Sequence, residues 1–206
     1  MKSFTQRLTI MVCVFSLASC DFMTPSMTIN YKVTVEIETP EGIKSGYAVR
    51  QISNRVPLVQ FPDVGNPASI RGEAVVVDLG ERGKVFYLLP QQSWQNGLYQ
   101  AFPTKGASTK EGIEYYKKLK IGDKAEWLKT PISFVYFSNL EDPTSLKAFN
   151  YGQIGDVLEE GYKVKSITVE ITDEPITNRI EPFIKRFGYR SGMFDRTRFQ
   201  RREREK

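Results

Sequence analysis

Apolar and polar residues alternate with a period of two near both ends of the chain, over residues 31–38 and 162–172. This period is typical of strands that bury one face and expose the other. A Pro-Glu-Gly turn at 40–42 predicts that the chain then reverses into a second strand over 43–52. Residues 53–72 are rich in proline and glycine, which predicts an irregular loop.

The middle of the chain predicts a hairpin. Residues 73–79 and 84–89 are short apolar runs, and Gly80 and Gly83 bound the turn between them. Because the runs are apolar on both faces, we expect central strands that are covered on both sides. A further strand is expected over 132–138, where apolar and aromatic residues dominate.

Helical signals are few. The spacing of Ser108 and Glu111 is that of a capping box, which predicts a short helix over 108–120. Residues 145–160 are expected to form a loop with one helical turn. Together these patterns predict a β-rich α+β fold, mainly an antiparallel sheet or a sandwich-like single domain, with one or two short helices.

The N-terminus has the pattern of a secretory signal peptide. Lys2 and Arg7 precede an apolar run of 11 residues, 8–18, which is too short to span a bilayer as a helix. The run ends in Leu-Ala-Ser-Cys, which resembles the lipobox of bacterial lipoproteins. That resemblance implies cleavage before Cys20 and acylation of its thiol, giving a stable bilayer anchor. A plain secretory signal is the alternative.

Asp21 follows the lipobox cysteine directly. In enterobacterial lipoproteins, an aspartate at this place resembles the signal for retention in the inner membrane. The resemblance implies a protein that faces the periplasm from that membrane, provided that the host follows the same sorting rule.

Composition excludes several chemistries. The chain contains no histidine, and its two cysteines, Cys13 and Cys20, both lie in the first 20 residues. Catalysis by Ser-His-Asp or Cys-His groups is therefore excluded, as are imidazole metal ligands and a zinc cluster in the folded part. We expect no cofactor and no metal.

Positive charge is concentrated at the C-terminus. Residues 20–182 hold 18 basic and 21 acidic residues, whereas 183–206 hold nine basic and three acidic ones. Five aromatic residues lie among them. The predicted anionic-surface binding residues of this tail are Lys185, Arg186, Arg190, Arg196, Arg198, Arg201, Arg202 and Arg204.

Arginine and aromatic residues together suit an anionic lipid surface, nucleic acid or an acidic protein. Secretion argues against nucleic acid. We therefore expect the tail to bind anionic lipid or an acidic envelope protein; a solvated tail with no specific partner is the alternative.

The remaining catalytic possibilities are Ser-Lys dyads, metal sites with oxygen ligands and paired carboxylates, and the residues considered are the carboxylates. They lie on the expected polar faces of strands or in turns, where structural roles are the simpler interpretation. Arg71, which precedes an apolar strand, is a candidate for binding an anion, or it pairs with a local acid. Tyr115, Tyr116 and Trp127 are candidates for lining a groove, although core packing is their simpler interpretation. The carboxylates considered are Glu36, Glu38, Asp63, Asp78, Asp173 and Glu174.

Residues 33–42, 71–80 and 167–177 resemble corresponding segments in a group of uncharacterised proteobacterial proteins, many with a lipoprotein signal. The resemblance covers roughly residues 30–178 and implies no catalytic or binding residue. The expected organisation is a signal peptide at 1–19, a lipidated tether at 20–29, a globular domain at 30–178 and the basic tail at 179–206.

The sequence therefore predicts a membrane-anchored envelope lipoprotein that acts as a non-enzymatic binding or accessory module. The alternative is an envelope hydrolase that uses two carboxylates on glycan or peptide substrates. Such an enzyme requires a cleft that holds two acids roughly 5–10 Å apart.

Overall fold

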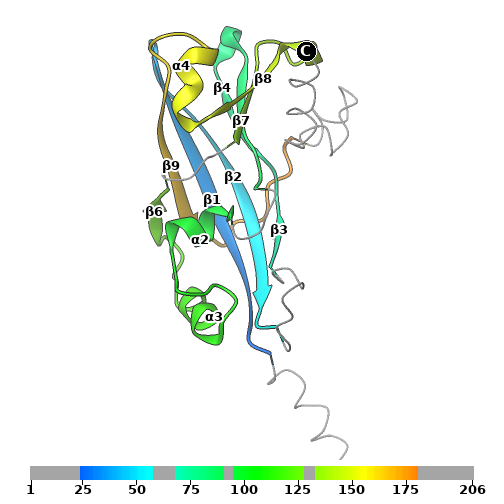
Figure 1. The fold of residues 1–206 in the computed structure, drawn as a ribbon, viewed down its shortest axis with the longest axis vertical. Helices are drawn as coiled ribbons and strands as arrows, with labels where there is room; N and C mark the ends of the chain where they lie inside the picture. Colours follow the sequence, from blue (N-terminus) through cyan, green and yellow to red (C-terminus); the bar gives the residue numbers. More distant parts are fainter. Residues whose placement is uncertain (1–23, 58–67, 91–94, 128–132, 181–206) are drawn as a thin grey trace, which may run out of the picture.

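Two antiparallel sheets form an elongated molecule, and the longest strands run along most of its length (Figure 1). The computed structural model of the protein describes residues 24–57, 68–90, 95–127 and 133–180. The predicted β-rich, single-domain α+β fold is confirmed.

The larger sheet has the strand order β3-β2-β1-β9-β6. Its centre is a hairpin of β1 (Ser26–Thr39) and β2 (Gly42–Arg55), each with 14 residues. At a rise of about 3.3 Å per residue the hairpin is about 46 Å long. β9 (Lys163–Ile171) pairs with the other side of β1, and the short strands β3 (Ser69–Arg71) and β6 (Lys124–Glu126) form the edges.

The smaller sheet has the order β4-β5-β7-β8. β4 (Val75–Asp78) and β5 (Lys84–Tyr87) form the predicted hairpin, and β7 (Ser133–Phe137) and β8 (Leu146–Asn150) follow. β5 is a central strand, as expected. The same expectation is wrong for β4, which pairs only with β5 and lies at the edge of its sheet.

In the described ranges three α-helices accompany the sheets, namely α2 (Gly97–Ala101), α3 (Lys110–Lys117) and α4 (Ile154–Val157). The N-cap of α3 is Thr109, whose hydroxyl accepts the N–H of Gly112. The prediction of Ser108 as the cap is wrong by one residue, because its hydroxyl bonds Asn54 instead. No helix in the described ranges is long and apolar enough to cross a bilayer. Short 3-10 turns are η1 (Gly80–Arg82), η3 (Pro143–Ser145) and η4 (Tyr151–Gln153).

Some elements were not predicted. β3 and β6 have three residues each, too few for a recognisable period, and β8 lies in a segment expected to be a loop. The helical turn expected over 145–160 is present as η4 and α4. β1 begins at Ser26, inside the segment that the sequence predicts to be tether, because Met27 is buried against the core.

The core lies between one face of the larger sheet and the layer formed by the smaller sheet, α2 and α3 (Figure 1). On β1 the odd-numbered residues from Tyr31 to Ile37 are fully buried. β2 passes close to β4 at Gly46, where an added Cβ would lie 1.8 Å from the carbonyl oxygen of Val76. Only glycine therefore permits the two sheets to approach this closely.

Candidate functional site

After β9 the chain crosses the outer face of the larger sheet as the C-terminal strap, residues 172–180. The Asn30 amide on β1 donates to the carbonyl of Glu174 over 3.0 Å. The strap then reaches the free edge of β2, where the N–H of Thr177 donates to the carbonyl of Val49 over 3.2 Å and its hydroxyl accepts from the Val49 N–H over 3.1 Å. The strap thus bonds to the edge of β2 beside the segment, residues 51–53, that pairs with β3.

The end of the strap is fixed to the smaller sheet. The Glu73 carboxylate, whose side chain is only 10% exposed, accepts the Ile180 N–H over 2.7 Å and lies 3.7 Å from Arg179. Ile180 is buried in an apolar cluster with Phe86 and Phe137. Arg179 also donates to the carbonyl of Tyr47 over 2.6 Å and lies 4.4 Å from its ring centroid.

A groove of about 330 Å³ opens where the strap, β2 and the smaller sheet meet. Its apolar lining comes from both sheets and from the strap, and charged side chains of both signs border it. The volume is at the lower end of that of small-molecule sites, so it suits one or two apolar groups of a ligand or a partner chain. The lining residues are Ser45, Gly46, Tyr47, Glu73, Ala74, Val76, Asp78, Lys84, Phe86, Leu140, Arg179 and Ile180.

The two acids of the groove, Glu73 and Asp78, both have structural partners. Asp78 is paired with Lys84 and accepts the N–H of Gly80 over 2.9 Å. The Lys84 ammonium beside it lowers the pKa of the Asp78 carboxyl, so that it is ionised at neutral pH. A general acid must hold a proton near the working pH, and Asp78 does not. Glu73 is engaged in holding the strap.

The largest fully buried side chain of the described residues is Arg50, which bonds to the backbone of the groove residue Glu73. Its Nε donates to the carbonyl of Glu73 over 3.0 Å, and Nη2 donates to the carbonyl of Tyr87 over 3.1 Å. The guanidinium carbon lies 4.9 Å from the Tyr87 ring centroid. Carbonyl oxygens and an aromatic face, rather than a carboxylate, therefore surround this buried charge.

Two polar atoms at this place, the Nη1 of Arg50 and the Oη of Tyr31, have no hydrogen-bond partner among the residues that the structure describes. The two residues are opposite each other in the β1–β2 pair. Burial raises the pKa of Tyr31 to about 12, and the nearby Arg50 charge partly offsets this. Gly72 packs against the arginine, since an added Cβ would lie 3.0 Å from Cγ of Arg50, and its φ of +133° also requires glycine.

The sequence singled out a different arginine. Arg71 is exposed on the edge strand β3, pairs in register with Gln51 and does not line the groove. Arg50 was missed, although its position carries a signal. It lies two residues from Ala48 and from Ile52, on the face of β2 that faces the core.

The other sequence candidates are scattered. Glu36 and Glu38 lie on the outer side of β1, and Glu36 accepts from Ser166 over 3.0 Å. Tyr116 and Trp127 are core residues, as the simpler interpretation holds, while Tyr115 is 40% exposed. Asp173 and Glu174 begin the strap, and Glu174 pairs with Lys32.

Cys20, Asp21, Asp63 and the basic tail residues from Lys185 to Arg204 lie outside the described residues, so their predicted roles stay predictions. In the part of the chain that is described, no three His, Cys, Asp or Glu side chains gather as a metal site would require. No protein-family model, curated protein or solved structure matches this chain.

Proposed function

We propose that this protein is a lipid-anchored protein of the bacterial cell envelope that acts as a non-enzymatic binding module. The observation that supports binding rather than catalysis is the state of the groove: its walls are largely apolar, and each of its acids has a structural partner. The lipobox at Cys20 supports the anchor.

The fold is compatible with this anchor. The first described contact is made by Pro25, whose carbonyl accepts the N–H of Val56 over 2.8 Å, and β1 begins at Ser26. Ser26 is the sixth residue after Cys20, so the start of β1 would lie within about 20 Å of the lipidated residue. The groove lies away from the start of β1. Its lining residue Tyr47, on β2, pairs with Thr34, which is eight residues after Ser26.

Replacing Cys20 by alanine is expected to abolish lipidation. Intact-mass measurement of the wild-type protein from membranes should fit cleavage before Cys20 plus a diacylglyceryl group and an amide-linked acyl chain. The Cys20→Ala protein should lack this mass and the processing that produces it. Cys13→Ala is the matched control and should keep both the mass and the membrane fraction. An unlipidated wild-type protein would contradict the anchor.

The basic tail can reach the same membrane. Arg179 contacts Tyr47, which is opposite Thr34 on β1, eight residues from Ser26. At about 3.3 Å per residue the tail therefore starts about 27 Å from the anchored end of the domain. The 26 residues from 181 to 206 would span up to about 90 Å if fully extended. We propose that the tail binds anionic lipid headgroups.

Deleting residues 183–206 should weaken binding of an unlipidated chain that lacks residues 1–20 to phosphatidylglycerol vesicles by at least about 100-fold at 0.1 M salt. The deletion removes a net charge of +6, and each basic residue near an anionic surface contributes about 1 kcal/mol. Binding of the full chain should also fall steeply with salt. Phosphatidylcholine vesicles are the control. Equal binding by both chains would exclude this role and favour an acidic protein as the partner.

An envelope hydrolase remains the alternative function, because the groove brings Glu73 and Asp78 together with Tyr47 and Phe86. The lowered pKa of Asp78 argues against it as the acid. Hydrolysis of a glycan or peptide that is lost in Glu73→Gln, with the fold intact, would overturn the binding module in favour of the enzyme.

A further inference from the structure

The molecule carries an exposed, lysine-rich surface on α3 and on the turn that follows it. Ile121 is 67% exposed, the most exposed large hydrophobic residue of the described chain, and Tyr115 is 40% exposed. Lysines precede and follow Ile121 in the sequence, and their side chains are also exposed. This α3 surface consists of Tyr115, Lys117, Lys118, Lys120, Ile121 and Lys124.

The charge of the α3 surface is not neutralised by ion pairs. Residues 117–124 contain four lysines and one acid, Asp123, whose carboxylate accepts the backbone N–H of Lys120 over 2.8 Å. None of the four lysines forms an ion pair with a residue that the structure describes. Further acids lie nearby, because Glu111 and Glu114 are exposed on α3, Glu126 is exposed on β6, and Glu170 is opposite Lys124 in the β6–β9 pair. A positive surface with an exposed apolar residue has the composition that binds anionic interfaces.

The α3 surface lies at the end of the molecule where β1 begins. Residues 26–29 of β1 line a second groove, of about 320 Å³, together with Tyr116, Lys117 and Leu119. The turn after α3 is held beside this groove, because the N–H of Gly122 donates over 2.9 Å to the carbonyl of Ile171, which also lines it.

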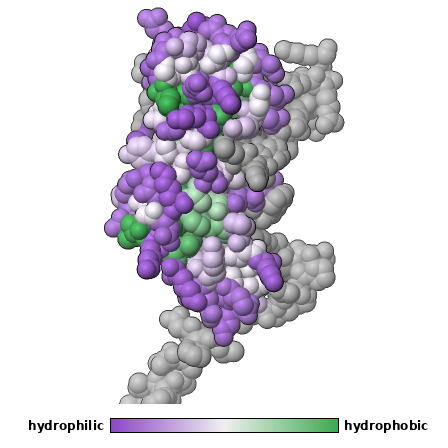
Figure 2. All heavy atoms as spheres, turned by 90° about the vertical axis from the view of Figure 1, so that its left-hand side faces the viewer, coloured by the Kyte–Doolittle hydropathy of each residue, from purple (hydrophilic) through white to green (hydrophobic). Residues whose placement is uncertain are grey.

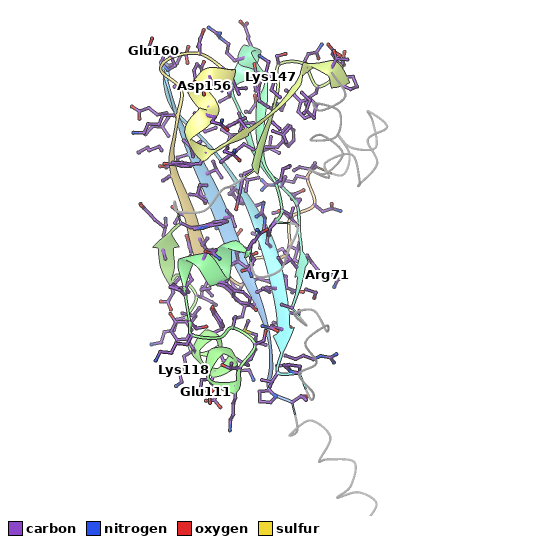
Figure 3. The ribbon with its side chains drawn as sticks, viewed as in Figure 1. Arg71, Glu111, Lys118, Lys147, Asp156 and Glu160 are labelled. Atoms are coloured by element: carbon purple, nitrogen blue, oxygen red, sulfur yellow. The ribbon has the colours of Figure 1, made fainter. Side chains whose placement is uncertain are left out.

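The side-chain view shows the same placement. Lys118 and Glu111 lie near one end of the molecule, and Lys147, Asp156 and Glu160 lie at the opposite end (Figure 3). The face that carries β6 and β9 is mostly hydrophilic, with a hydrophobic area near its middle and smaller ones elsewhere (Figure 2). Positive charge and exposed apolar groups on α3 therefore lie on the side of the domain from which the lipidated tether would extend.

We propose that the α3 surface is a membrane-contact site that binds anionic phospholipid headgroups, an inference that rests on the proposed lipid anchor at Cys20. The lysines would contact phosphate groups, while Ile121 and Tyr115 would enter the interfacial region. A tether alone would leave the domain free to rotate. Contact at the α3 surface fixes its orientation and holds the strap and its groove away from the bilayer, where a periplasmic partner can reach them.

The test uses the lipidated protein in phosphatidylglycerol vesicles that contain a headgroup-attached quencher. Since Cys20 would be the only cysteine of the processed chain and its thiol would carry the lipid, a single new cysteine can be labelled with a fluorophore. Glu111→Cys and Glu160→Cys are matched positions, both exposed glutamates, at opposite ends of the domain. The label at position 111 should be quenched and the label at position 160 should not.

Charge reversal separates specific contact from simple proximity. Lys118→Glu combined with Lys120→Glu should shift the equilibrium from the docked to the free orientation by at least about 25-fold, or about fivefold per lysine, and so remove quenching at 111. Ile121→Ser should weaken the quenching at 111, because it removes the apolar side chain that would enter the interfacial region. Lys147→Glu combined with Lys163→Glu, at exposed positions outside the α3 surface, is the control and should leave quenching unchanged.

The outcomes distinguish the two proposals. If the protein does not float with the vesicles, the lipid anchor itself is wrong. If it floats but the labels at 111 and 160 are quenched equally, the anchor stands and the α3 surface is not a contact site. Quenching at 111 that persists in phosphatidylcholine vesicles, or in the Lys118→Glu and Lys120→Glu protein, would overturn the recognition of anionic lipid.

Discussion

Above about pH 10 the domain is expected to unfold, and unfolding should be complete by about pH 12. Burial raises the pKa of both Tyr31 and Tyr116 to about 12, and burial also raises the pKa of Tyr87 and Tyr99. In the unfolded chain all four titrate near pH 10. Stability contributed by the neutral phenols is therefore fully present below about pH 10 and is lost as the pH rises toward 12.

The expected loss is large. Each tyrosine that ionises only after unfolding lowers the free energy of unfolding by about 1.4 kcal/mol per pH unit. Four such residues give about 5 kcal/mol per pH unit, against a typical domain stability of about 5–15 kcal/mol. Between pH 6 and 9 the stability should change little, since the chain has no histidine.

Circular dichroism and tyrosinate absorbance, followed together through an alkaline titration, measure this effect. The loss of structure should coincide with the part of the absorbance change that comes from the four buried phenols, because these ionise only on unfolding. Tyr31→Phe should move the transition to higher pH, since it removes both a buried titrating group and a hydroxyl without a hydrogen-bond partner. Tyr115→Phe, at an exposed ring, is the control and should not move it. Ionisation of all tyrosines well before loss of structure would contradict the prediction.

Replacing Arg50 by alanine is expected to lower the free energy of unfolding by about 3–5 kcal/mol. The substitution leaves the carbonyls of Glu73 and Tyr87 without their donor and opens a cavity between the sheets. Arg50→Lys keeps the charge but loses the planar group with several donors, so we expect an intermediate loss. Arg50→Met keeps much of the volume and removes the unpartnered Nη1, so its loss should be smaller than that of alanine.

Urea denaturation of these proteins measures the loss in free energy of unfolding, which should be largest for alanine, smaller for lysine and smallest for methionine. Arg71→Ala is the matched control, because Arg71 lies exposed on the strand next to β2 and should change the stability by less than about 0.5 kcal/mol. A loss below about 1 kcal/mol for Arg50→Ala would show that the carbonyl contacts do not stabilise the fold. A loss confined to the region of the groove would appear as a changed denaturant slope rather than a changed midpoint.

Several elements follow from local pattern alone. The period of two in β1 and β9, the turn at 40–42 and the glycines around the β4–β5 turn place these strands nearly where the structure has them. Helix α3 is also local, because a threonine hydroxyl that accepts the N–H of Gly112 sets its start. The one-residue error at Ser108 shows the limit, since two adjacent hydroxyls are equivalent caps until Asn54 engages one of them.

The sequence by itself determined the strand-rich class, the absence of histidine chemistry and the concentration of positive charge in the tail, and the address at Cys20 stays its prediction. Only the tertiary structure decided that β4 is an edge strand, that Arg50 is buried and that Glu73 holds the strap. It also brought the α3 surface beside the start of β1. The reason is that successive side chains of a strand point to opposite faces, so the alternation of apolar and polar residues can be recognised from neighbouring residues alone. The burial of a charge, the order of strands and the shape of a groove depend instead on contacts between segments as much as 144 residues apart, which a local pattern does not encode.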